Sequence, residues 1–412
     1  MRQIVTYSLL FVAITACTPL PFHHPVPEKA LSQATVFGFP QDIRFWADEA
    51  PEGMEHMVSE RIKLYQQTHV DYYATHQRYP AINYLAISGG AYDGAFGAGL
   101  LSGWSDAGTR PEFMMITGVS TGALIAPFVF VGQKYDPLLR DFYTNTKSDN
   151  IFNASVWKVV DGITGGLALI DSSPLAEKIR TSVTPQMLEE IAEEHRKGRR
   201  LYVITTHIEA QRGMIWDIGA IAASNNPDAL MLVHKIMLAS ASVPGLFEPV
   251  FIDVTVGNQH YSEIHADGGV TSQVFAYPLK LNRMVIDEFK QAGLKRRMYI
   301  IRNSKVTPEY KAMEPGLFSL SGRSLETLTK YQGLGDLYRL YIGTKRDDID
   351  YNLATIPADF LETSNEIFDP IYMQKLFALG YAMGKRQDGW MKTPPGVDYL
   401  TPATGASKLG LR

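Results

Sequence analysis

The sequence predicts an α/β protein, a three-layer sandwich in which a mostly parallel central sheet carries helices on both faces. Two observations lead to this fold class. Short apolar runs that end in glycine-rich turns alternate with helical patterns between residues 82 and 302, and strands separated by helices are typical of parallel sheets. The composition of the 412 residues, 45% hydrophobic and 20% charged, fits a globular protein with a sizeable core.

The charge and cysteine content excludes several classes of protein. Lysine and arginine number 39 against 43 aspartates and glutamates, a net charge of −4. This balance offers no basic excess to neutralise phosphates, so we expect no nucleic-acid partner. The single cysteine rules out an intrachain disulfide and a thiolate metal cluster. No sequence feature indicates an oligomeric state.

The first 17 residues are typical of an export signal. A positive start precedes an apolar stretch at residues 4–14, which has the length of a secretory signal rather than of a membrane span. Residues 14–17 (I-T-A-C) resemble a bacterial lipobox, which implies a signal peptide at residues 1–16 and acylation of Cys17. An ordinary signal peptide with an incidental cysteine remains the alternative.

The residues after Cys17 indicate a location. Several acyl chains would anchor the protein stably to a membrane. Because Thr18 replaces the aspartate that retains lipoproteins in the inner membrane, the resemblance favours the outer membrane of a bacterial envelope. Four prolines within residues 19–27 predict an extended tether, with His23 and His24 as part of it rather than a metal site.

The elements are expected in the following order. Residues 61–65 read as part of a helix within an N-terminal tether and extension at 17–80. A central domain at 81–305 is predicted to contain strands at 82–87, 113–117, 199–209, 214–219, 250–254, 261–266 and 298–302, and helices at 94–104, 123–130, 175–196 and 229–241. Residues 306–412 form a mostly helical extension with helices at 325–342 and 371–385.

A possible nucleophile lies between the second strand and its helix. Residues 118–122 read G-V-S-T-G, and a G-x-S-x-G motif between a strand and a helix is the context of a nucleophile elbow. The tight turn needs Gly118 and Gly122, and it exposes the hydroxyl of Ser120. The start of the helix also favours a developing negative charge at Ser120.

Two further glycine-rich turns follow predicted strands. The first contains Gly89, Gly90, Ala91 and Gly94, and its backbone amides are candidate donors to an oxyanion. A phosphate-binding loop is the rival interpretation, but the turn lacks the Lys-Ser/Thr of a Walker motif, and an aspartate within the turn would repel a pyrophosphate.

The second turn is Asp267 with Gly268 and Gly269. Taken alone, Asp-Gly indicates only a turn. Taken together with Ser120 and the Gly89 turn, Asp267 is a candidate general base.

Together these motifs resemble the patatin-like phospholipases. A fourth stretch, residues 239–247 (A-S-A-S-V-P-G-L-F), matches the family as well, so the resemblance covers roughly residues 80–305. It implies a patatin-like fold and a lipid acyl hydrolase of the phospholipase A or lysophospholipase type. Ser120 would be the nucleophile and Asp267 the base, and amides of Gly89, Gly90 and Ala91 would form the oxyanion hole. Membrane lipids would be substrate and anchor, and no cofactor or metal is implied.

Two positions depart from the family pattern and leave alternatives open. Ala91 replaces a glycine, and Asp93 stands where the family usually has an arginine. One alternative is a Ser-His-Asp hydrolase that uses Asp253 with His260 or His265, which follow Ser120 in the chain order of the α/β-hydrolases. The other is an envelope lipoprotein with a decayed site that binds lipid or a partner.

Overall fold

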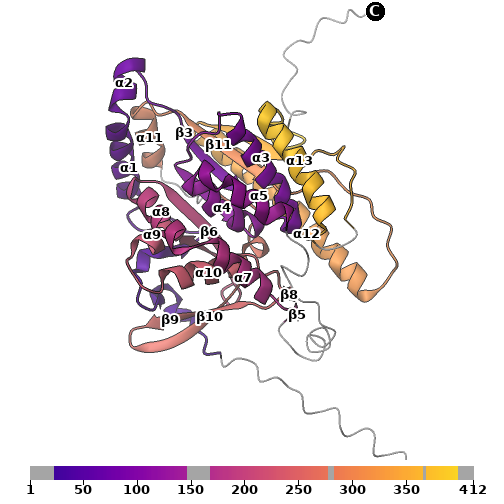
Figure 1. The fold of residues 1–412 in the computed structure, drawn as a ribbon. Helices are drawn as coiled ribbons and strands as arrows, with labels where there is room; N and C mark the ends of the chain where they lie inside the picture. Colours follow the sequence, from indigo (N-terminus) through magenta and orange to yellow (C-terminus); the bar gives the residue numbers. More distant parts are fainter. Residues whose placement is uncertain (1–22, 146–167, 277–282, 365–367, 398–412) are drawn as a thin grey trace, which may run out of the picture.

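The computed structural model describes residues 23–145, 168–276, 283–364 and 368–397. Its centre is a ten-stranded sheet with helices around it (Figure 1). The strand order is β1-β9-β10-β6-β4-β3-β11-β12, to which β7 is added beside β6 and β2 beside β7. The strands are β1 (Thr35–Val36), β2 (Arg44–Trp46), β3 (Ile82–Ile87), β4 (Met115–Val119), β6 (Arg200–His207), β7 (Arg212–Asp217), β9 (Val250–Val256), β10 (Gln259–Asp267), β11 (Arg296–Arg302) and β12 (Ile349–Thr355). Two short strands, β5 (Ala168–Ile170) and β8 (Gly245–Phe247), form a separate pair.

Helices cover both faces of the sheet, which confirms the predicted fold class. They are α1 (Met54–Thr68), α2 (Val70–His76), α3 (Gly94–Asp106), α4 (Thr121–Val131), α5 (Asp136–Thr144), α7 (Ser173–Ser182), α8 (Pro185–Arg196), α9 (Ile218–Ala223), α10 (Ala229–Ser240), α11 (Arg283–Gln291), α12 (Leu317–Arg346) and α13 (Pro370–Arg386). Side chains alternate along β11: Ile301 belongs to the large core with α3, α4 and α13, whereas Met298 and Ile300 belong to a second core under α12. Two cores on opposite faces make three layers.

The sheet combines a parallel half with an antiparallel half. Strands β6, β4, β3, β11 and β12 run parallel, as the sequence predicts for the central strands. The strands beyond β6 pair antiparallel. The parallel strands end at the same edge, where α/β proteins place their sites, and Ser120 follows directly after β4.

Both terminal segments contribute to the sheet, which therefore runs across the boundaries expected at residues 80 and 305. Strands β1 and β2 from the N-terminal segment pair with β9 and β7, and β12 from the C-terminal segment pairs with β11. His23 and His24 are docked rather than free. The His23 ring lies 2.6 Å from Glu209 Oε1 and 3.0 Å from Ser262 Oγ, and His24 Nδ1 lies 2.9 Å from the His260 carbonyl. Cys17 and the signal peptide lie outside the described residues.

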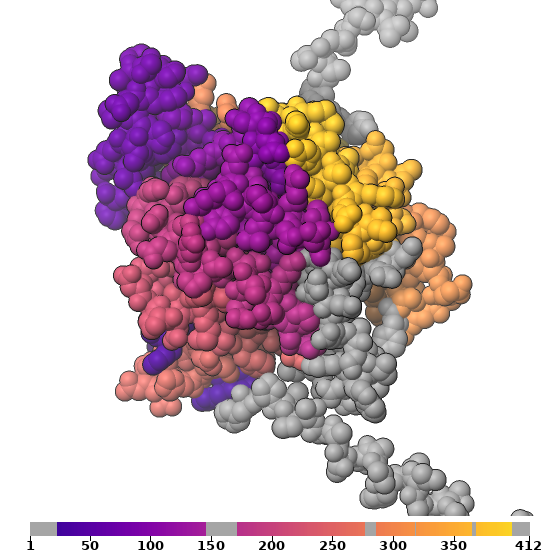
Figure 2. All heavy atoms as spheres, in the orientation of Figure 1, coloured from indigo at the N-terminus to yellow at the C-terminus, as the bar shows by residue number. Residues whose placement is uncertain are grey.

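Helix α13 packs against α3 and α5. In the space-filling view α13, in yellow, lies against the purple helices of the first half of the chain (Figure 2). A Cβ at Gly99 of α3 would lie 2.1 Å from the Phe377 carbonyl oxygen of α13, so only glycine permits this approach of the two backbones. Part of the C-terminal segment is therefore structural support. Within the ranges described, no helix combines the length and the hydrophobicity needed to cross a bilayer.

Candidate active site

Ser120 occupies a strained turn between β4 and α4. Its backbone has φ 54° and ψ −122°, a conformation that residues with a side chain rarely adopt and that is concentrated at functional sites. The Ser120 amide donates to Ser240 Oγ at 3.0 Å, and the Ser240 hydroxyl donates to the Ile204 carbonyl at 2.8 Å. The end of α10 therefore holds the turn in place. The Ser120 side chain is largely buried, with 8% exposed.

Asp267 ends β10 and is equally well fixed. Its amide donates to the Ser242 carbonyl at 2.8 Å, and its carbonyl accepts from the Thr206 hydroxyl at 2.9 Å. The carboxylate oxygen Oδ1 accepts the Gly269 amide at 2.6 Å. The other oxygen, Oδ2, is buried and has no hydrogen-bond partner in the described part of the chain. One oxygen of this carboxylate is thus available to accept a proton.

The Ser120 hydroxyl influences the pKa of Asp267. Burial raises the pKa of Asp267 to about 7, while the Ser120 hydroxyl and the Gly269 amide act in the opposite direction. The Ser120 hydroxyl is therefore close enough to influence the carboxylate, although its present geometry does not satisfy Oδ2. Catalytic hydrogen bonds are often loose without substrate. A carboxyl group with a pKa near 7 is suited to act as a general base at neutral pH.

The predicted oxyanion turn lies beside Ser120. A Cβ at Gly89 would lie 3.2 Å from Ser120 Cβ. Gly90 has φ 155°, and a Cβ there would lie 2.1 Å from the Asn303 carbonyl oxygen, so glycine is required at this position. The backbone amides of Gly90 and Ala91 have no acceptor among the described residues. These two amides are the candidate oxyanion donors.

Gly89 does not fit the role expected for it. Its amide donates to the Gln273 carbonyl at 3.1 Å. This bond joins the turn to the segment that follows Asp267, so the amide serves the packing of the site rather than an oxyanion. The first residue of α4, Thr121, offers another amide without an acceptor in the described part of the chain, as the first turn of a helix must. The G-x-S-x-G motif could have predicted this donor, because the residue after the serine of a nucleophile elbow contributes its backbone amide to the oxyanion hole.

The remaining motif glycines lie at close contacts between these turns. Glycines 94, 118, 122, 268 and 269 would each place a Cβ less than 3.0 Å from a neighbouring atom. For Gly122 that atom is the Ile87 carbonyl oxygen, and for Gly268 it is the Ile204 carbonyl oxygen. The motifs therefore bring the ends of β3, β4, β6 and β10 together.

Asn303 fixes the oxyanion turn through hydrogen bonds. The sequence analysis did not identify this residue. It is fully buried. Its amide donates to Ser88 Oγ at 2.8 Å, its Nδ2 donates to the Ser88 carbonyl at 2.9 Å, and its Oδ1 accepts the Gly97 amide at 3.0 Å. One side chain thus joins the turn to α3. The available signal was its place directly after a predicted strand at the edge where sites form.

The two residues that depart from the family pattern are accommodated. Ala91 adopts φ 48°, a left-handed conformation that a glycine would adopt at lower cost. The Tyr372 hydroxyl of α13 donates to Asp93 Oδ1 at 2.9 Å. Burial raises the pKa of Asp93 to about 7, against the lowering effect of Tyr372. Asp93 is therefore directed toward α13 and loses part of its negative charge near neutral pH.

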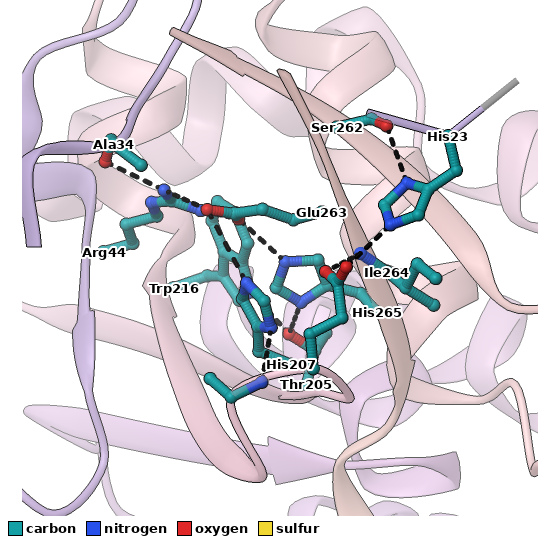
Figure 3. A network of polar contacts seen from close by, with 12 residues as sticks. His23, Ala34, Arg44, Thr205, His207, Trp216, Ser262, Glu263, Ile264 and His265 are labelled. Carbon is teal, nitrogen blue, oxygen red and sulfur yellow. Dashed lines mark hydrogen bonds and ion pairs between the residues drawn. The ribbon is translucent and has the colours of Figure 1, made fainter. Parts of the chain in front are cut away.

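The residues of the Ser-His-Asp alternative do not assemble around Ser120. Both ring nitrogens of His265 have other partners, with Nδ1 2.8 Å from Thr205 Oγ1 and Nε2 3.1 Å from Glu263 Oε2 (Figure 3). Burial lowers the pKa of His265 to about 4. Asp253 is exposed and pairs with Lys235, and His260 lies on the exposed part of β10.

The cluster of His207, Glu263 and His265 has the spacing of a metal site, since its ligand atoms lie within 4.8 Å of one another. Arg44 nevertheless engages both oxygens of Glu263, at 2.5 and 3.0 Å (Figure 3). The Ala210 amide donates to His207 Nδ1, which leaves the proton of the neutral ring on Nε2. A cation at this cluster would meet a guanidinium and a protonated nitrogen, so the donor set fits a buried ion pair better than a metal.

The comparisons with known proteins agree with these motifs. A model of the patatin-like phospholipase family matches residues 85–280, which include the glycine turn, Ser120 and Asp267. No curated protein matches the chain. Matches among solved structures include the crystal structure of VipD from Legionella pneumophila, with a TM-score of 0.36 and 10% identity over 75% of this chain and 68% of VipD; this likeness is too distant to inform the function. Residues 85–280 are thus a patatin-like phospholipase domain.

Proposed function

We propose that this protein is a serine lipid acyl hydrolase that uses Ser120 and Asp267 as a catalytic dyad. The observation that carries the proposal is the buried carboxylate beside Ser120, with one unpartnered oxygen and a pKa raised to about 7. Because residues 85–280 match the patatin-like phospholipases, which are lipid acyl hydrolases, we expect the substrates to be esters of lipids.

The reaction proceeds through an acyl-enzyme. Ser120 Oγ bonds to the ester carbonyl carbon while its proton passes to Asp267. The C–O bond of the ester then breaks, and the departing oxygen takes that proton. Water attacks the acyl-enzyme and gives its proton to Asp267, and the Ser120 oxygen leaves and regains a proton. The cycle releases a fatty acid and an alcohol.

In this proposal, three backbone amides would stabilise the oxyanion. Those of Gly90 and Ala91 come from the glycine turn, and that of Thr121 comes from the first turn of α4. The partial positive charge at the start of a helix adds to their effect. Each such donor contributes about 3–4 kcal/mol to transition-state stabilisation in comparable sites. Apart from the substrate and the attacking water, the proposed route uses only groups of the chain itself.

Hydrolysis of phospholipid vesicles by purified variants tests the dyad. We expect Ser120→Ala and Asp267→Asn each to lower kcat by a factor of at least about 10³, because nucleophile and base act as one unit. Asp253→Asn, which changes an exposed aspartate on β9, is the control and should keep full activity. Full activity in Ser120→Ala would refute the proposal, and inactivity of the unmodified protein toward every lipid ester would favour a decayed, lipid-binding site.

We also propose that acylated Cys17 holds the protein on the outer membrane, close to its substrate. The lipobox-like residues 14–17 support this part of the proposal. Labelling of cells with a palmitate analogue should mark the unmodified protein and not Cys17→Ser, and the variant should leave the membrane fraction. Retention of label by Cys17→Ser would contradict the anchor and leave the dyad untouched.

A further inference from the structure

A cavity of about 130 Å³ lies at the opposite edge of the sheet from Ser120. Its walls include Ile82, Met115 and Arg296, which stand at the beginnings of β3, β4 and β11, whereas Ser120 follows the end of β4. Helices α1 and α11 lie side by side over this edge (Figure 1). The cavity is thus separated from the candidate active site by the length of the strands.

The walls of the cavity are mainly apolar. Side chains from the N-terminal segment, the sheet and α11 contribute to them, among them Phe45, Val58, Ile62, Ile215, Phe275 and Phe289. A pocket with such walls and a few convergent polar groups is the usual form of a small-molecule site. The polar groups in this cavity are unusual because three of them are arginines.

The arginines carry more positive charge than their surroundings balance. Among the described residues, the buried Nε atoms of Arg61 and Arg296 have no acceptor, and neither arginine forms an ion pair. The Tyr202 hydroxyl, a hydrogen-bond partner of Arg61, is neutral and does not balance its charge. Arg296 donates to the backbone carbonyl of Asp347 and lies 4.4 Å from the centre of the Phe289 ring. Only Arg200 faces a carboxylate, with its Nε 3.6 Å from Asp217 Oδ2.

The arginines also act on each other. Burial lowers the pKa of Arg200, and the nearby charge of Arg61 lowers it further. Arg296 is buried and Arg61 is partly buried, and a guanidinium charge withdrawn from water is costly when no carboxylate balances it. An anion that entered the cavity would relieve both the desolvation and the mutual repulsion, and guanidinium groups bind carboxylates and phosphates with good geometry.

We propose that this cavity binds a single-chain anionic amphiphile, with its carboxylate or phosphate head at Arg61, Arg200 and Arg296 and its tail against the apolar walls. An apolar cavity of about 150 Å³ accommodates benzene, so the cavity holds a tail of about six carbons, and longer tails extend beyond it. The proposal concerns binding and does not depend on the chemistry at Ser120.

Calorimetric titration of the purified protein tests the ligand class. Octanoate and octyl phosphate carry the two head groups on the same tail. Acetate carries a head without a tail, and octyltrimethylammonium carries the tail with the opposite charge. We expect at least one of the two anions to bind at least 10-fold more tightly than both controls. Binding of the cation as tight as that of the anions, or no binding of either anion at millimolar concentration, would overturn the proposal.

Variants locate the binding. Arg61→Met should weaken binding of the better anion at least 10-fold, whereas Lys63→Met, which removes an exposed charge from the same helix, should leave it unchanged. Val58→Trp, which fills the cavity, should also abolish binding, and its melting temperature reports whether it folds. Ser120→Ala should bind the anion as well as the unmodified protein. Binding lost in Ser120→Ala but kept in Arg61→Met and Val58→Trp would assign the ligand to the active site instead.

Discussion

Ser120 and Asp267 are each held in an energetically unfavourable state. Ser120 keeps a left-handed backbone that its side chain disfavours, and Asp267 keeps a buried carboxylate with one unsatisfied oxygen. Both conditions persist because neighbouring residues enforce them: Ser240 binds the amide of Ser120, and Ser242 binds that of Asp267. Local cost of this kind is concentrated at functional sites.

The pH dependence of activity follows from the pKa of Asp267. If Asp267 is the base, kcat/KM for a soluble ester should rise with pH and reach half of its maximum near pH 7, because the carboxylate must be ionised. Asp93 has a similarly raised pKa, so Asp93→Asn is the matched control and should keep this midpoint. If Asp93→Asn shifted the midpoint of the pH profile, the titrating group would be Asp93, and the assignment to Asp267 would be wrong.

The same raised pKa has a consequence for stability. The folded protein holds the Asp267 proton more tightly than the unfolded chain, so this group favours folding below about pH 4, and its contribution is lost as pH rises through about 7. Asp267→Asn removes the buried charge and should therefore raise the free energy of unfolding at pH 8 by roughly 1–4 kcal/mol. Denaturant melts at pH 8 and pH 5 measure this. A variant that is less stable than the unmodified protein at pH 8 would contradict the burial argument.

At the scale of elements, the glycine turn is held from both sides. Asn303, after β11, joins it to α3, and Gln273 accepts the amide of Gly89. The turn is thereby fixed before any substrate binds, as preorganised electrostatic stabilisation requires.

Asn303→Ala tests this clamp. Loss of the two side-chain hydrogen bonds of Asn303 leaves the buried Ser88 carbonyl and Gly97 amide without these partners, so we expect a destabilisation of about 2–3 kcal/mol. We also expect a fall in kcat of about 10- to 100-fold with little change in KM, since the oxyanion donors would be misplaced. The control is Asn226→Ala, which removes two exposed side-chain hydrogen bonds, one to the Gly38 carbonyl and one from the Asp228 amide. A change in KM alone would assign Asn303 to substrate binding instead.

The sequence predicted most elements because their signals are local. The strand at 82–87 and the helix at 229–241 agree with β3 and α10 within one residue. The helix expected at 175–196 is instead two helices, because Pro185 begins a new one after Val183 takes an extended conformation. Strand β12 was missed, and so was Asn303. Their roles depend on partners distant in the chain, which no local pattern reveals.

At the scale of the whole molecule, a buried ion pair joins the N-terminal segment to the central sheet. The sequence did not reveal this pair. Arg44, near the N-terminus, binds both oxygens of Glu263 on β10 and the Ala34 carbonyl. Burial alone would raise the pKa of Glu263, but Arg44, His207 and His265 hold it well below its ordinary value. The N-terminal segment is thus fastened to the strand that ends in Asp267.

Removal of one partner should be costly. Arg44→Met leaves Glu263 charged and buried, so we expect a loss of about 3–5 kcal/mol in the free energy of unfolding. Because the pKa of Glu263 is depressed, its stabilising contribution is present above its ordinary pKa and is lost as pH falls. The difference between variant and unmodified protein in denaturant melts should therefore be greater at pH 7 than at pH 3. Arg212→Met, which removes exposed ion pairs, should cost less than about 1 kcal/mol.

Covalent labelling with a fluorophosphonate, followed by peptide mass spectrometry, tests the central claim most directly. The dyad predicts modification of the peptide that contains Ser120, and labelling at least about 100-fold slower in Asp267→Asn, because the base would be absent. Modification of a different serine, or an unchanged rate in Asp267→Asn, would contradict the pairing of Ser120 with Asp267.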